Sequence, residues 1–130
     1  MTDKPCSSAP DAGWLLDEDA RAALLRRFPP RYANAVAHHV TAKPTPPGDT
    51  APEPASCRLI GRVDDGAGVE ALVAEIGGTT DRPDGSTFHI TWSLDRARGR
   101  RPVESNDVIR RLGWEALAEP VPVTLVPARF

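Results

Sequence analysis

The sequence predicts a single α+β domain with a curved, mainly antiparallel sheet and helices on one side of it. Its 130 residues are enough to bury one hydrophobic core but not two. Apolar residues follow helical or strand-like spacing in the order helix, strand, strand, helix, strand, helix, strand. A short motif of histidine, an aliphatic residue and threonine occurs twice, in two of these strands. We expect those two strands to be the central ones of the sheet.

The chain begins with a tail and a helix. Residues 1–12 are polar and contain proline and serine, which predicts a disordered N-terminal tail ahead of a domain at 13–130. A helix is predicted over 17–28, where acidic residues occupy the first turn, arginines occupy the last, and two prolines follow. Its apolar face consists of Leu16, Ala20, Ala23, Leu24 and Phe28.

Two strands and a second helix are predicted next. Residues 35–42 form the first motif strand, and the proline-rich residues 43–56 form a long loop near it. A strand follows over 57–63, with Cys57, Leu59 and Val63 on one face. A second helix is then predicted from apolar residues at i, i+3, i+4 and i+7, which are Val69, Leu72, Val73 and Ile76.

The C-terminal half contains the second motif strand. Residues 81–85 predict a turn, 87–94 predict the strand, and 95–101 form a basic loop. A short third helix is capped by Ser105 and directs Val108, Ile109 and Leu112 inward. The last strand, over 121–126, is flanked and interrupted by prolines, which lack the N–H that a central strand needs. We therefore place it at a sheet edge.

Composition argues against several classes of protein. No apolar run is long enough to span a bilayer, and the first residues lack the pattern of a signal peptide, so we expect a cytoplasmic protein. The net charge of −2 argues against electrostatic coating of nucleic acid. Cys6 and Cys57 suggest neither a disulfide framework nor a thiolate metal cage, and no other metal-ligand spacing is evident. We therefore expect a monomer with no metal, no cofactor and no membrane contact.

The repeated motif is the feature that carries chemistry. Alternate side chains of a strand share a face, so His39 and Thr41 point to a solvent-facing surface and Val40 points to the core. Residues 89–91 repeat this arrangement. Two imidazoles can hold opposite protonation states near neutral pH, and two hydroxyls can hold phosphate oxygens, which suffices to open a phosphodiester without a metal. His38 is expected to point the opposite way, toward the core or a helix, as a structural residue.

The paired motifs resemble those of the 2H phosphoesterase superfamily, in particular the cyclic phosphodiesterase domain of fungal-type tRNA ligases. The resemblance rests on the first motif with Phe28-Pro29 and the helix before it, and on the second motif with Phe88 before it and Ser105-Asn106-Asp107 after it. It covers most of residues 14–130. The chain differs in being shorter than many members and in carrying His38 directly before the first motif.

This resemblance implies a bilobal sheet with pseudo-twofold symmetry and a central cleft between the motif strands. It implies that His39 and His89 are the catalytic acid–base pair and that Thr41 and Thr91 bind the phosphate oxygens. The implied substrate is a nucleotide 2′,3′-cyclic phosphate or an RNA end that carries one, as in RNA processing and repair. Either histidine can be the base, and the product can be a 2′- or a 3′-phosphate.

Further residues are candidates for substrate binding. The arginine-rich loop after the second motif suits either a solvated surface or contact with a phosphate or an RNA backbone. Two residues near the first motif suit a phosphate contact and base stacking, and the resemblance adds two at the start of the third helix. These candidates are Arg96, Arg98 and Arg100 in the loop, Lys43 and Tyr32 near the first motif, and Ser105 and Asn106 in the helix. Trp92 alternates away from the motif face and is expected in the core.

Two alternative functions stay open. A related enzyme would hydrolyse 2′–5′ or cyclic oligonucleotide signals. The size of the cleft would distinguish this enzyme from one that acts on 2′,3′-cyclic phosphates. A nucleotide-binding module would keep the pocket without turnover, although two complete motifs argue against it. A histidine-triad hydrolase is excluded, because its chemistry needs alternating histidines in one strand and each motif here has one histidine followed by threonine.

Overall fold

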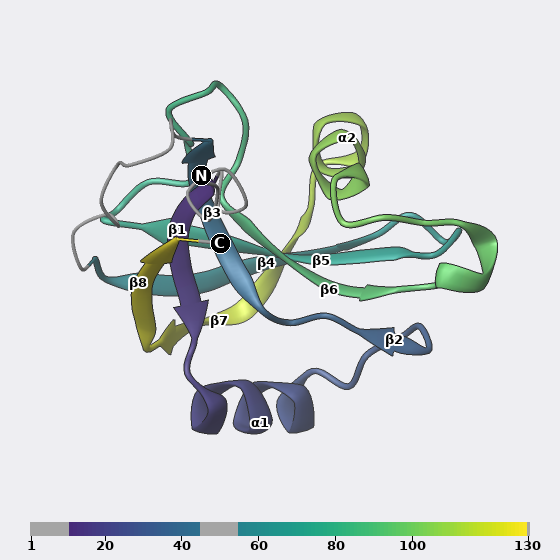
Figure 1. Cartoon of the computed structure of the whole chain (residues 1–130), viewed down its shortest axis with the longest axis horizontal. Coiled ribbons are helices and arrows are strands. Elements are labelled where there is room, and N and C mark those ends of the chain that lie inside the picture. The colour runs from purple at the N-terminus through teal and green to yellow at the C-terminus, as the bar shows by residue number, and fades with distance from the viewer. Residues whose placement is uncertain (1–10, 45–54, 130) are drawn as a thin grey trace, which may run out of the picture.

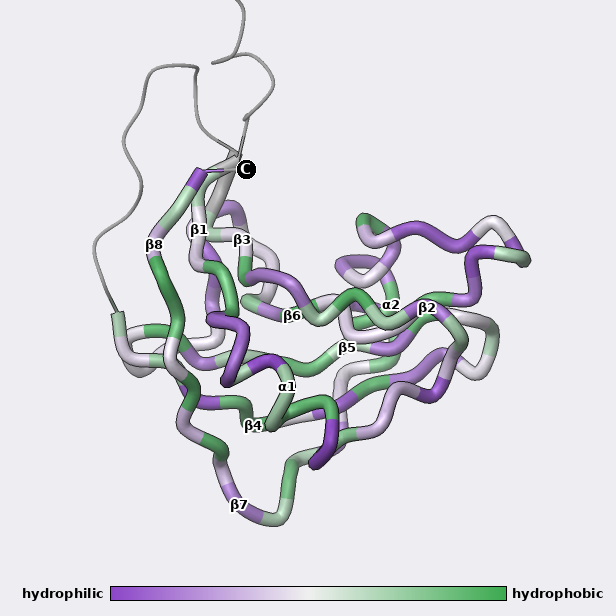
Figure 2. Tube along the Cα trace, turned by 60° about the horizontal axis from the view of Figure 1, so that its bottom comes forward, coloured by the Kyte–Doolittle hydropathy of each residue, from purple (hydrophilic) through white to green (hydrophobic). Residues whose placement is uncertain are grey.

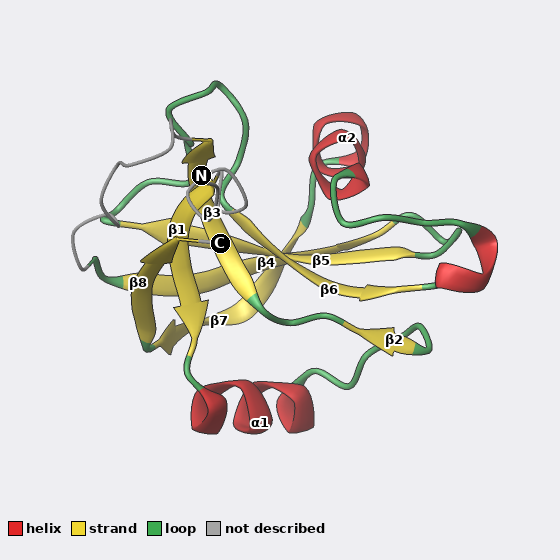
Figure 3. Ribbon diagram, viewed as in Figure 1, coloured by secondary structure: helices red, strands yellow, loops and turns green. Residues whose placement is uncertain are grey.

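The computed structural model describes residues 11–44 and 55–129 (Figure 1). Within them it has two antiparallel sheets, two α-helices and one 3₁₀ turn (Figure 3). The strands are β1 Asp11–Leu16, β2 Asn34–Ala35, β3 His39–Pro44, β4 Cys57–Asp64, β5 Val69–Ile76, β6 His89–Leu94, β7 Glu115–Val123 and β8 Leu125–Arg129. The helices are α1 Glu18–Arg27 and α2 Glu104–Leu112, and the 3₁₀ turn is η2 Arg96–Arg98. The predicted α+β class with antiparallel pairing is confirmed.

The strands divide between a larger and a smaller sheet. The larger sheet has the order β2-β6-β5-β4-β7, and the smaller has the order β3-β1-β8. Figures 1 and 2 show the strands of the smaller sheet running across one end of the larger sheet. The proline-containing β7 and β8 are edge strands, as predicted for the C-terminal strand. Of the motif strands, β6 is interior but β3 lies at a sheet edge, so the prediction that both are central is wrong.

The N-terminal elements follow the prediction closely. Asp17 is the N-cap of α1, and its carboxylate accepts a hydrogen bond of 2.9 Å from the backbone N–H of Asp19. Leu24 of this helix is buried, whereas Ala23, assigned to the apolar face, is exposed. β1 takes in Asp11 and Ala12, which the sequence assigned to the tail. Residues 1–10 and 45–54, which hold most of the predicted tail and loop, lie outside the described residues.

Residues 69–76 form a strand instead of the predicted helix. β5 lies between β4 and β6, and seven of its eight residues are buried. A strand that is buried on both faces needs an almost continuous apolar run, and such a run also satisfies helical spacing. The pattern of Val69, Leu72, Val73 and Ile76 therefore could not distinguish the two structures.

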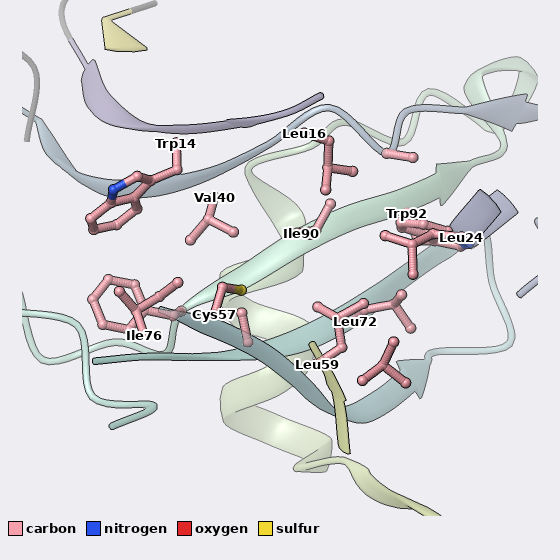
Figure 4. Packing of buried hydrophobic residues seen from close by; sticks show 14 of the residues in the cluster. Trp14, Leu16, Leu24, Val40, Cys57, Leu59, Leu72, Ile76, Ile90 and Trp92 are labelled. Atoms are coloured by element: carbon pink, nitrogen blue, oxygen red, sulfur yellow. The ribbon is translucent and has the colours of Figure 1, made fainter. Parts of the chain in front are cut away.

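Two hydrophobic clusters cover the two faces of the larger sheet, and alternate residues of β5 contribute to each. The first packs β1, β3 and α1 against one face (Figure 4) and includes Trp14, Leu24, Val40, Leu72, Ile90 and Trp92. The second packs α2 against the other face and includes Val69, Ala71, Val73, Val108 and Ile109. The helices therefore lie on opposite faces, and not on one side as predicted. The core position expected for Trp92 is confirmed.

Local geometry corrects two further expectations. A β-bulge between Leu59 and Gly61 turns Val63 into the cluster under α2, so Val63 does not share a face with Cys57 and Leu59. The N-cap position of α2 is Val103, and Ser105 lies buried inside the first turn instead of capping it. Leu112, expected to point inward, is 54% exposed. Neither helix of the described residues is long and apolar enough to cross a membrane.

The predicted first motif strand is broken in the middle. Residues 34–37 run alongside β6, and the N–H of Ala37 donates to the carbonyl of Thr91 at 3.0 Å. Ala37 then adopts a φ of 45°, which strand residues do not use, and the chain turns away. The carbonyl of His38 accepts from the N–H of Leu16 at 2.9 Å, and β3 continues beside β1. The chain thus passes from the larger sheet to the smaller one immediately before the first motif.

Candidate active site

The segment that leads into the first motif runs antiparallel to the strand of the second motif. Asn34 pairs with Leu94 and Ala35 with Ser93, and Ala37 donates to Thr91. This pairing ends two residues before His39 on one chain and two residues after His89 on the other. The strands separate after Ala37, which opens a gap in the backbone pairing at the level of the two histidines.

The motif histidines both point away from the first hydrophobic cluster. Val40 and Ile90 are fully buried in the first hydrophobic cluster, as predicted, so their neighbours His39 and His89 point to the opposite side. His89 lies opposite Val73 of β5, and Val73 packs against α2. His89 therefore lies on the face of the larger sheet that α2 covers.

His39 is held neutral by its surroundings. Burial, and then the nearby charges of His38 and His89, together lower its pKa to about 4. The interaction with His89 shows that the two motif imidazoles are close enough to disfavour a second positive charge. His39 is therefore a neutral imidazole at neutral pH in the unliganded protein.

His38 does not occupy the core position expected for it. Its side chain is exposed, and its Nδ1 lies 2.9 Å from Nδ1 of His39. The alternation of a regular strand would have sent the two rings to opposite faces, but the positive φ of Ala37 interrupts the strand directly before them. One ring donates a hydrogen bond to the other, so His38 contributes to the tautomer of His39.

His89 is buried, with 9% of its surface exposed. Its Nδ1–H donates to the carbonyl of Thr87 at 2.8 Å, which places the lone pair of the neutral ring on Nε2. Burial lowers the pKa of His89, the hydrogen bond to Thr87 opposes that shift, and the charges of Arg82 and Asp84 act in opposite directions. His89 is thus a neutral imidazole whose tautomer the backbone fixes.

Thr91 is held by the segment that leads into α2. Its hydroxyl lies 2.9 Å from Oγ of Ser105 and 3.3 Å from the carbonyl of Pro102. A hydroxyl has one proton to donate, so Thr91 can reach a phosphate oxygen only by giving up one of these partners. Thr41 of β3 is half-buried and pairs with Gly13. The two threonines therefore differ in their surroundings.

A buried arginine, which sequence reasoning missed, adjoins the second motif. The Arg82 side chain is 8% exposed and bonds Asp84 through Nε at 3.0 Å and Nη2 at 2.9 Å. It also donates to Oδ1 of Asn106 at 3.3 Å. The Arg82 guanidinium, and then Ser86, hold the pKa of the Asp84 carboxyl far below its usual range. The residue pattern 81–85 showed only a turn, and no spacing in the sequence indicated that its arginine is buried beside His89.

The remaining candidates divide into two groups. Ser105 and Asn106 lie beside the second motif, through the contacts with Thr91 and Arg82. The others lie beyond the far end of β6, where Leu94 is about 17 Å along the strand from His89 (Figure 1). There Arg98 pairs with Asp95 at 3.0 Å, and Arg100 pairs with Asp65 at 2.8 Å and with Glu104 at 2.5 Å. The Tyr32 hydroxyl donates to Asp64, and the backbone N–H of Arg96 donates to Asn34 at 3.1 Å. The Lys43 side chain lies outside the described residues.

Residues 11–44 and 55–129 contain no cluster of three or more histidine, cysteine or acidic side chains arranged to hold a metal ion. A cavity of about 440 Å³ lies between residues 84–87 and α2. Its lining includes Thr87 and Asn106 but neither motif histidine, so it adjoins the histidine pair without containing it.

Comparisons of the chain with protein-family models, with curated proteins and with solved structures found no match. The chemistry of the site is therefore argued from its geometry.

Proposed function

We propose that this protein is a phosphodiesterase of the 2H type, which hydrolyses the 2′,3′-cyclic phosphate of RNA ends or nucleotides by two-histidine acid–base catalysis. The observation that carries the proposal is the closeness of His39 and His89, which follow and precede the antiparallel pairing of residues 34–37 with β6 and which interact electrostatically. On this proposal the two sheets correspond to the two lobes of the 2H architecture, and the separation of β3 from β6 forms the central cleft.

The two imidazoles supply both proton transfers. The neutral ring accepts a proton from water as the water oxygen bonds to phosphorus, and the protonated ring donates to the ribose oxygen as its bond to phosphorus breaks. One P–O bond forms and one breaks, and the product is a phosphomonoester beside a free ribose hydroxyl. Both rings are neutral in the unliganded protein, so the negative charge of bound substrate favours the protonation of one of them.

Charge on the phosphate oxygens needs separate stabilisation. The Thr41 hydroxyl is the half-buried donor of the first motif, and Thr91 donates after releasing Pro102 or Ser105. The buried guanidinium of Arg82 adds a positive charge beside the second motif. These groups neutralise the phosphate, and so we propose that the reaction needs no metal ion.

One observation favours a second candidate, a nucleotide-binding module without turnover. The Thr91 hydroxyl is occupied by Ser105 and Pro102, whereas catalysis by the proposed route uses it for the phosphate. A binding protein would have no need to release it. The two candidates differ in whether a bound cyclic nucleotide is consumed.

A panel of three substrates tests the proposal: a 2′,3′-cyclic nucleotide, a linear 2′–5′ dinucleotide, and an RNA that ends in a cyclic phosphate. Each is incubated with and without EDTA, and phosphorus NMR identifies the product. We expect hydrolysis of the two cyclic phosphates, unchanged by EDTA and lost in His39→Gln and His89→Gln. Loss of activity in EDTA that a divalent ion restores would overturn the metal-free mechanism. Binding without any product would overturn catalysis in favour of the binding module.

A further inference from the structure

The cavity beside the second motif is placed to receive another part of the substrate. It measures about 440 Å³ and lies between residues 84–87 and the first two turns of α2. Thr87 joins it to the histidine pair, because the Thr87 carbonyl accepts the hydrogen bond from His89 and Thr87 also lines the cavity. The two residues are separated by about 7 Å of extended chain. A group attached to a ribose whose cyclic phosphate lies at His89 can therefore reach into the cavity.

The charged groups that line the cavity are paired with one another or with neighbouring arginines. Two carboxylates, Asp84 and Asp107, line it together with one guanidinium, that of Arg110. Hydrogen bonds from Arg110, and then from Arg111, lower the pKa of Asp107, so this carboxyl is ionised at neutral pH. Both carboxylates are paired with arginines, Asp84 with Arg82 and Asp107 with Arg110 and Arg111. The acceptor positions that remain on Asp107 suit a neutral group with N–H donors.

The hydrogen-bonding groups that remain match one nucleobase. Arg110 and Arg111 each donate one bond to Asp107, and an ionised carboxylate has about four acceptor positions, so it can accept more. The Asn106 amide donates one N–H to the carbonyl of Val103 and has a second. A donor beside a carboxylate acceptor complements the edge of guanine, which presents a carbonyl oxygen and two N–H groups. Exposed Val103 and the planar guanidinium of Arg110 supply surfaces for the base to pack on.

We propose that this cavity binds the nucleobase of the substrate nucleotide and favours guanine, with Asp107 accepting its N–H groups and Asn106 donating to its carbonyl. The proposal rests on the proposed function, since it takes the cyclic phosphate to be at the histidine pair. It narrows the substrate class to a guanosine 2′,3′-cyclic phosphate, free or at the end of a short RNA.

Three substrates that share one cyclic phosphate test the cavity. They are guanosine 2′,3′-cyclic phosphate, the inosine analogue, which lacks only the exocyclic amine, and 1-O-methylribose 2′,3′-cyclic phosphate, which lacks a base. We expect kcat/KM to fall about tenfold from guanosine to inosine, mainly through KM, because one hydrogen bond to a charged acceptor is lost. The base-free compound should be hydrolysed more slowly still. Equal kcat/KM for all three would overturn the proposal and leave the phosphodiesterase activity standing.

Two variants of α2 separate the role of Asp107 from a general effect of charge. Asp107→Asn should remove the preference for guanosine over inosine. Glu104→Gln removes a negative charge from the same helix outside the cavity, where Glu104 pairs with Arg100, and should keep the preference. Loss of the preference in both variants, or in neither, would overturn the assignment.

If none of the three compounds is hydrolysed, the proposed function is overturned. A binding measurement still tests whether the cavity binds guanine. Calorimetric titration of the wild-type protein with the guanosine and inosine cyclic phosphates then compares their affinities directly. Tighter binding of the guanosine compound supports the base site in a protein without turnover. Equal affinities overturn it.

Discussion

The Nδ1 atoms of His38 and His39 lie 2.9 Å apart, so the N–H of one ring donates a hydrogen bond to the other ring. A second proton on the pair would place two positive charges at hydrogen-bond distance, which is unfavourable. This contact adds to burial, the larger cause, in lowering the pKa of His39 to about 4. The extra histidine that precedes the first motif is therefore part of the electrostatics of the site.

The first prediction concerns the His38→Ala variant. The pKa of His39 should rise from about 4 but stay below 6.5, because burial and the charge of His89 remain. Titration of the imidazole ring protons by NMR measures the shift. Hydrolysis should persist, since the proposed mechanism assigns the proton transfers to His39 and His89. A variant that folds but is inactive would show that His38, not His39, is the catalytic residue.

The second prediction concerns the motif histidines themselves. His39→Gln and His89→Gln should each lower kcat by about 10²- to 10⁴-fold, the usual contribution of a general acid or base. His89 is buried and not solvent-facing as the sequence suggested, so His89→Ala should also lower stability, by about 1–3 kcal/mol, through the unpaired carbonyl of Thr87. Thermal unfolding measures this, and His38→Ala, at an exposed ring, is the control. An unchanged melting temperature for His89→Ala would contradict the buried position.

The sequence predicted the second motif strand and the inward-facing residue of each motif correctly, because alternation over a few residues depends only on local geometry. Val40 and Ile90 are buried in the core, and α1 lies where the charge pattern placed it. The identity of β5 was not predictable in this way. Whether an eight-residue apolar run becomes a helix or a strand depends on its neighbours, and β5 is a strand because β4 and β6 pair with it on both sides.

The candidate site was predictable only in part, for a similar reason. The break at Ala37 comes from a single positive φ in a non-glycine residue, which no residue pattern announces, and it reverses the position expected for His38. The buried position of Arg82 depends on Asp84 and on Asn106, which comes from a distant helix. The arginines of the basic loop became candidates for substrate binding only because several occur together. Arg98 and Arg100 instead pair with acidic groups far from the histidines.

The third prediction compares two arginines of β4. Arg62 pairs with Glu70 of β5 at 2.6 Å, and the Glu70 side chain is fully buried; Arg58 pairs with Glu75 at 2.6 Å in an exposed position. Arg62→Met leaves a buried carboxylate without its main partner and should lower the free energy of unfolding by about 3 kcal/mol. Arg58→Met, its matched control, should cost less than about 1 kcal/mol. Urea denaturation measures both, and equal losses would contradict the difference in burial.

The fourth prediction links the pKa of His39 to stability. This pKa is about 4 in the folded protein and 6.5 in the unfolded chain, so the unfolded chain binds the proton more tightly. The contribution of neutral His39 to stability is therefore fully present above pH 6.5 and declines as the pH falls from 6.5 to about 4. Urea denaturation at several pH values should show a shallower decline in His39→Gln. A decline as steep as in the wild type would contradict the low pKa.

The fifth prediction is the pH dependence of kcat/KM, which reports the ionisation of the free protein. Activity requires one neutral and one protonated imidazole, so the profile is a bell whose two limbs belong to the coupled pair. Below the lower pKa both rings are charged and the base is lost; above the higher pKa both are neutral and the acid is lost. The pKa values of His39 and His89 both lie below 6.5, so the maximum should also lie below pH 6.5, with activity falling toward neutral pH. Hydrolysis of a 2′,3′-cyclic nucleotide across the acidic and neutral range measures the profile. A maximum above pH 7 would contradict the pairing of two histidines whose pKa values burial and mutual repulsion lower.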